Sequence, residues 1–75
     1  MSAKEMFEEL GYKIIVNDDD WIIYENNEEF TKKITFSKLN KQYWCGRYFI
    51  PDYLYLVINI RLNKAIQKQI EELGW

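Results

Sequence analysis

The chain has 75 residues, of which 48% are hydrophobic and 29% charged, and its formal net charge is −2 at pH 7. A chain of this length has room for one modest hydrophobic core, so we expect a single domain over residues 1–75. Its one cysteine, Cys45, excludes an internal disulfide, and the sequence shows neither a signal peptide nor an apolar run of the ~20 residues that a membrane span needs. We therefore expect a cytoplasmic protein with no membrane partner.

The first predicted element is a short helix. Ser2 and Glu5 have the spacing of a capping box, in which each side chain accepts a hydrogen bond from the other residue's backbone amide. Apolar residues recur at helical spacing from Ala3 to Leu10, and Gly11 favours the left-handed conformation that ends a helix. We expect the helix to end after Leu10.

Three segments with strand chemistry follow the helix. Residues 12–16 and 21–25 are β-branched and aromatic, and the polar cluster between them predicts a turn. Residues 26–27 are both Asn, which tolerates a positive φ and predicts a tight turn. In residues 30–37, apolar and polar side chains alternate, with Lys32 as the one polar residue on the inner face.

The second half of the chain carries two more strand segments. Residues 42–50 form the first, and Gly46 predicts a bulge within it. Pro51 and Asp52 separate it from residues 53–58. Short turns between consecutive strands predict an antiparallel meander of four strands, or of five.

The last predicted element is a second helix, with Asn59 as its N-cap and Gly74 as the residue that ends it. Apolar side chains share one face of this helix: Leu62, Ala65, Ile66, Ile70 and Leu73. We expect Leu62, Ile66 and Ile70 to form the helix side of the core. Two amphipathic helices at the chain ends can lie on one face of a meander, so the predicted fold is α+β, in the order αββββα.

The composition argues against an enzyme. The chain has no histidine, which is the commonest general base and metal ligand. Cys45 lies within a predicted strand, where a cysteine is more often a small buried hydrophobic residue than a nucleophile. Asp18, Asp19 and Asp20 lack the alternating spacing and the glycine of a calcium loop, so we interpret them as a solvated turn. We expect no catalytic residue, no metal site and no cofactor.

Charge is divided unevenly along the chain. Residues 1–29 hold nine acidic residues against two basic ones, whereas residues 30–51 hold five basic residues and no acidic one. The five are Lys32, Lys33, Lys38, Lys41 and Arg47. Basic residues interleaved with aromatic ones on adjacent strands indicate a nucleic-acid-binding module over residues 30–50 as one alternative. The other interpretation is cross-strand charge matching with the acidic second strand, which an overall pI near 5.0 favours.

Several predicted strands are apolar on both faces, although two short helices can cover only one of them. A protein target, or a second copy of the chain in a two-fold dimer, is therefore expected on the other face. Depending on register, Ile15 and Ile22 would face water there. The candidate protein-binding residues are Tyr24, Trp44, Tyr48 and Tyr55. The alternative is that these aromatic rings lie flat on the surface with their polar atoms in water.

Three segments carry a resemblance to known proteins: AKEMFEELGY at residues 3–12, ITF at 34–36 followed by NKQY at 40–43, and AIQKQIEELGW at 65–75. They resemble small uncharacterised proteins encoded by phages and prophages of Gram-positive bacteria. The shared patterns concern capping and packing, so no functional residue is carried over. The resemblance implies the host cell cytoplasm as the setting and, by analogy with other small phage proteins, an inhibitor of a host defence system such as a CRISPR nuclease.

The leading hypothesis from the sequence is thus a non-enzymatic phage or prophage accessory protein that binds a protein partner. The alternative is the nucleic-acid-binding module described above.

Overall fold

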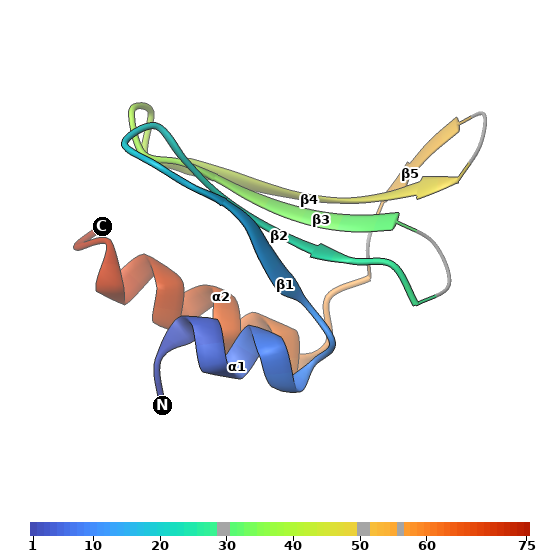
Figure 1. Cartoon of the computed structure of the whole chain (residues 1–75), viewed down its shortest axis with the longest axis horizontal. Helices are drawn as coiled ribbons and strands as arrows, with labels where there is room; N and C mark the ends of the chain where they lie inside the picture. Colours follow the sequence, from blue (N-terminus) through green and yellow to red (C-terminus); the bar gives the residue numbers. More distant parts are fainter. Residues whose placement is uncertain (29–30, 50–51, 56) are drawn as a thin grey trace.

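The computed structural model describes residues 1–28, 31–49, 52–55 and 57–75, with residues 47–49 and 52–55 described by their backbone alone. The elements in chain order are α1 (Ala3–Glu9), β1 (Lys13–Asn17), β2 (Trp21–Asn26), β3 (Thr31–Ser37), β4 (Gln42–Phe49), β5 (Asp52–Tyr55) and α2 (Ile60–Glu72). The described strands form an antiparallel sheet in the order β1-β2-β3-β4-β5, and both helices lie on one face of it (Figure 1). The predicted α+β meander with two terminal helices is confirmed.

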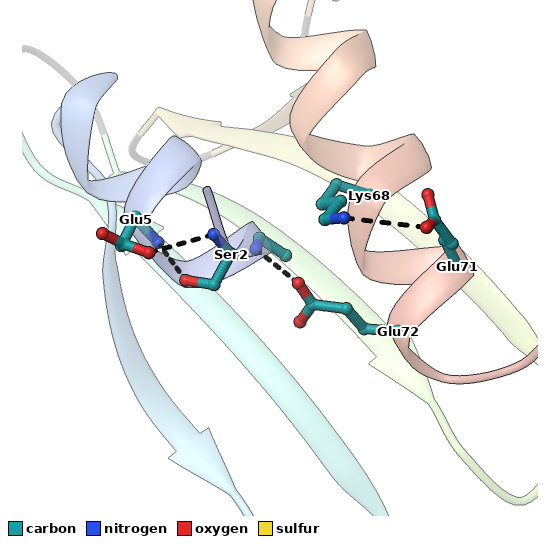
Figure 2. Close-up of polar contacts among 6 residues, drawn as sticks. Ser2, Glu5, Lys68, Glu71 and Glu72 are labelled. Atoms are coloured by element: carbon teal, nitrogen blue, oxygen red, sulfur yellow. Dashed lines mark hydrogen bonds and ion pairs between the residues drawn. The ribbon is translucent and has the colours of Figure 1, made fainter.

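Local capping fixes the helix ends where the sequence predicts them. The Glu5 amide donates to Ser2 Oγ over 3.1 Å, and the Ser2 amide donates to Glu5 Oε1 over 3.0 Å (Figure 2). The side chain of Asn59 accepts a backbone hydrogen bond of 2.9 Å in the first turn of α2. Gly11 and Gly74 follow the two helices with φ of 88° and 75°, where a side chain would be strained.

The two helices lie side by side in antiparallel directions, so the start of α1 meets the end of α2 (Figure 1). At this junction the Ala3 amide donates to Glu72 Oε2 over 2.7 Å (Figure 2). The amide is one of those that a helix start leaves without a partner inside the helix, and Glu72 satisfies it. A single hydrogen bond thus joins residues that are 69 positions apart.

The pairing of β2 with β3 decides which side chains face the helices. Ile22 pairs with Phe36 and Tyr24 with Ile34, and all four side chains are buried. Phe7 of α1 stacks on Tyr24, with 3.9 Å between ring centroids and 19° between ring planes. The core comprises Phe7, Tyr12, Ile22, Tyr24, Ile34, Phe36, Leu62, Ala65 and Ile66. It therefore lies between the centre of the sheet and the helix layer.

The apolar stripe of α2 faces this core. Leu62 and Ile66 are buried, and Ile70 packs partly buried against its edge, which confirms the predicted helix face. Gln69 lies on the same face and is only 4% exposed. A pattern built from apolar residues alone could not identify this buried polar side chain.

The bulge predicted at Gly46 is wrong. Gly46 pairs with Lys33 on one side and with Tyr55 on the other, in unbroken register with both neighbours. The irregularity lies instead in β1, between Ile14 and Val16. β1 is an edge strand and pairs on one side only, so an extra residue disturbs one ladder, whereas at Gly46 it would disturb two.

Two predicted boundaries also differ from the structure. Asn26 belongs to β2 and is buried, with its Nδ2 donating to the Leu10 carbonyl over 3.2 Å and its Oδ1 accepting from the Glu28 amide over 2.9 Å. The strand predicted over residues 53–58 ends at Tyr55 in the described chain, and Val57 is an exposed residue outside the sheet. The chain must leave the sheet there to reach the helix layer. The predictions for residues 29–30, 50–51 and 56 lie outside the described residues.

Candidate protein-binding face

The sheet face opposite the helices, here called the open face, is not covered by either helix (Figure 1). Val16 pairs with Ile23, Ile23 with Thr35, and Thr35 with Trp44. Because directly paired residues point to the same side of a sheet, these four form one row across the open face. Ile23 is half-buried and Thr35 is buried in this row, whereas Trp44 is 45% exposed.

A charged row runs beside this one. Lys13 pairs with Glu25, and Glu25 pairs with Lys33. The Lys33 ammonium lies 3.7 Å from Glu25 Oε2, and both side chains are partly exposed. The predicted matching of basic and acidic strands is therefore present between β2 and β3, and Glu25 offsets one of the two lysine charges in this row.

Among the side chains that the structure describes, two tryptophans are exposed next to each other on the open face. The ring centroids of Trp21 and Trp44 are 6.0 Å apart and the ring planes meet at 81°, so the indoles make a corner. Trp21 is 37% exposed and Trp44 is 45% exposed. The corner borders a shallow, open hollow whose lining is Val16, Asp18, Trp21, Ile23, Lys33, Thr35 and Trp44.

Asp18 places a fixed carboxylate at the end of this hollow. Its Oδ1 accepts from the Asp20 amide over 2.9 Å and from the Trp21 amide over 2.8 Å. These two hydrogen bonds hold the pKa of Asp18 below its ordinary value, so the group is a carboxylate at neutral pH. The three aspartates form an exposed turn, and within the described chain no cluster of three or more His, Cys, Asp or Glu is placed to hold a metal ion.

The structure separates the four predicted protein-binding residues. Trp44 is exposed on the open face. Tyr24 points to the opposite side, is 1% exposed and donates its hydroxyl proton to Gln69 Oε1, so the expectation of a surface role for it is wrong. Tyr48 and Tyr55 pair through their backbones with Thr31 and Gly46, and their side chains lie outside the description.

The sequence missed Trp21, which belongs to the site. Residues 21–24 are all apolar, so the sequence could not show which members of the run face the helices. The register with β3 decides the question. Tyr24 pairs with the buried Ile34, so Ile22, two positions before Tyr24, also lies on the core side and Trp21 lies on the other side. Of the two isoleucines expected to face water, Ile22 is buried and Ile15 is 48% exposed.

The basic residues predicted for nucleic-acid binding do not share one surface. Lys33 lies on the open face in the charged row. Lys32 points to the helix side, as predicted, where it lines a small cavity near the start of α2. Lys38 donates to the Asp18 carbonyl, and Lys41 is exposed in the β3–β4 turn. Arg47 lies where only the backbone is described. The four described lysines therefore do not line a single groove.

Cys45 pairs with Ile34 and packs half-buried against the core. Burial raises the pKa of its thiol to about 11, so the thiol is protonated at neutral pH. The thiolate is the reactive form of cysteine, and this position disfavours it.

Comparison of the chain with protein-family models, curated proteins and solved structures finds no match. The resemblance to phage proteins therefore stays a prediction. In the described ranges, none of the helices combines the length and apolar character that crossing a membrane requires.

Proposed function

We propose that this protein is a non-enzymatic binding module that recognises a protein partner through its open face, with the Trp21–Trp44 corner at the centre of the contact. The observation that supports this proposal is the partial exposure of two adjacent tryptophans on the face opposite the helix layer. Tryptophan is the residue type most enriched among those that dominate binding energy at protein interfaces, because it buries a large apolar area when water is excluded.

The surroundings of the corner suit a contact surface. The strands beneath it are fixed by the buried core on their other side, so the two indoles are held in place before a partner arrives. Such preorganisation lowers the entropy lost on binding. Asp18, Lys33 and Glu25 surround the apolar centre with polar groups, which is the usual anatomy of a protein interface.

Affinity purification with matched variants tests this proposal. The resemblance to phage proteins makes a Gram-positive lysate the appropriate source. The wild type, Trp44→Ala and Ile60→Ala would be compared as baits, since Ile60 is 74% exposed on α2 and loses an apolar side chain on the other side of the molecule. We expect a partner that the wild type and Ile60→Ala retain and Trp44→Ala loses. Equal recovery by all three baits, or no partner above background, would contradict the open face as the binding surface.

A further inference from the structure

We infer that the hollow beside the tryptophan corner receives a cationic side chain of the partner, preferably an arginine, from a short segment that is otherwise apolar. This inference rests on the proposed function and names the chemistry of the segment that the open face recognises. Three observations carry it: the shape of the corner, the charge at its end, and its small area.

The corner presents aromatic surface in two directions. Because the planes of Trp21 and Trp44 meet at 81°, a side chain in the angle between them contacts both indoles. A cation over an indole face is attracted by the negative charge of the π system, and tryptophan is the best aromatic partner for this contact. A guanidinium is planar and weakly hydrated, so it stacks on such a face at a lower desolvation cost than an ammonium.

The charge at the hollow favours a cation near the turn. Its lining holds one carboxylate, Asp18, and one ammonium, Lys33. The Lys33 ammonium lies 3.7 Å from Glu25, at the charged row. At the other end, Asp18 keeps its negative charge, and Asp19 and Asp20 are exposed beside it. Lys38 donates to the Asp18 carbonyl and so brings one positive charge to this turn. Because the turn holds three aspartates, it keeps an excess of negative charge.

The size of the corner fits a single anchoring side chain. With exposures of 37% and 45%, the uncovered parts of the two indoles amount to at most roughly 200 Å². A stable interface between two folded proteins buries about 800 Å² on each partner. The corner alone is therefore about a quarter of such a contact area, which is the scale of one anchoring side chain of a partner segment.

Selection of displayed peptides tests this inference without knowledge of the natural partner. A library of random 12-residue peptides would be selected on the wild-type protein and depleted on Trp44→Leu, which keeps an apolar side chain but removes the indole. We expect the surviving peptides to be enriched in arginine next to aliphatic or aromatic residues. If the Trp44-dependent peptides contained no basic residue, the inference that the hollow receives a cationic side chain would be wrong, but the proposed function would be supported. The absence of any Trp44-dependent peptide would overturn both.

A second measurement tests how much the negative charge of Asp18 contributes to peptide binding. Asp18→Asn keeps a side-chain oxygen that can accept from the Asp20 and Trp21 amides, so the turn is retained while the charge is lost. For the best selected peptide, measured by fluorescence anisotropy, we expect binding about threefold weaker to Asp18→Asn and about tenfold weaker to Trp44→Leu. Replacing the arginine of the peptide by citrulline should weaken wild-type binding more than Asp18→Asn does, because a neutral side chain loses its attraction both to Asp18 and to the indole faces.

Glu9→Gln is the matched control, because it removes one exposed negative charge from α1, on the other side of the sheet. Peptide affinity for this variant should equal that for the wild type at physiological salt. If Asp18→Asn and Glu9→Gln both bind the arginine peptide as the wild type does, Asp18 does not recognise the cation and the inference is overturned.

Discussion

The hydroxyl of Tyr24 donates to the side-chain oxygen of Gln69 over 2.6 Å, and these two residues are only 1% and 4% exposed. The bond joins the middle of the sheet to α2 inside the core. Tyr24→Phe leaves a buried acceptor without its donor, so we expect the free energy of unfolding to fall by about 1–2 kcal/mol. Urea denaturation monitored by tryptophan fluorescence measures the change.

The double variant Tyr24→Phe/Gln69→Leu provides the control for this prediction. Replacing both partners by apolar groups of similar shape removes the unsatisfied acceptor, so the double variant should be more stable than Tyr24→Phe alone. If the second substitution brought no recovery, the cost of Tyr24→Phe would not come from the orphaned oxygen of Gln69.

The buried tyrosines predict a loss of stability at alkaline pH. Burial raises the pKa of Tyr24 and that of Tyr12 from 10.0 to about 12. Between pH 10 and 12 the unfolded chain releases these protons while the folded protein keeps them, so the unfolded state binds fewer protons and stability falls as pH rises. Burial also raises the pKa of the Cys45 thiol from 9.0 to about 11, so this group adds to the loss of stability from about pH 9 upward.

Urea midpoints measured from pH 8 to pH 11 check this prediction. Tyr24→Phe removes one of the shifted groups, so its stability should fall less steeply above pH 10 than that of the wild type. A slope that is the same for the wild type, Tyr24→Phe and Tyr12→Phe would show that neither phenol is held in its protonated form by the fold.

The helix side of the core gives a third prediction. Ile66 of α2 is fully buried in the core, so Ile66→Ala should destabilise the protein by about 2–5 kcal/mol through lost apolar burial and the cavity left behind. Ile60→Ala, on the same helix but 74% exposed, should change stability by less than about 0.5 kcal/mol. Similar effects of the two substitutions would contradict the assigned helix face. Thermal unfolding distinguishes them.

The sequence predicted the features that depend on neighbouring residues. The capping box of Ser2 and Glu5 and the cap at Asn59 each involve residues no more than three positions apart, so the sequence contains both partners of each interaction. The glycines that end the helices are equally local. The order of the elements followed from these helix caps, from the glycines that end the helices and from the short turns between strands.

The features that depend on distant residues were harder to predict. Whether Trp21 or Ile22 faces the helices depends on the register with β3, and the apolar run 21–24 fits both registers. For this reason only one residue of the Trp21–Trp44 corner, Trp44, was identified from the sequence, while Tyr24 was placed on the wrong side. The bulge was misplaced because a glycine indicates freedom of the backbone, whereas the position of β1 at the sheet edge is a property of the whole fold.

Nucleic-acid binding gives a fourth prediction. The described lysines of the predicted site lie on both sheet faces and in a turn, and Lys33 is close to Glu25. We therefore expect no complex with a labelled single-stranded oligonucleotide at micromolar protein in low salt. Fluorescence anisotropy at two salt concentrations checks this. Tight binding that weakens steeply with salt would indicate released counterions and would favour the nucleic-acid module over the protein-binding proposal.

The oligomeric state distinguishes between the two partners that the sequence predicts for the open face, a protein target and a second copy of the chain. A two-fold dimer through this face would bury the Trp21–Trp44 corner against its own copy, whereas the inferred arginine-bearing segment needs the corner to be accessible in the free protein. We therefore expect a monomer of 9.2 kDa across a tenfold dilution in size exclusion coupled to light scattering. A mass near twice that value, falling on dilution and abolished by Trp44→Ala but not by Ile60→Ala, would instead place a second copy on the open face. In that case the corner would be occupied in the free protein, and any arginine-bearing segment would have to compete with the dimer for it.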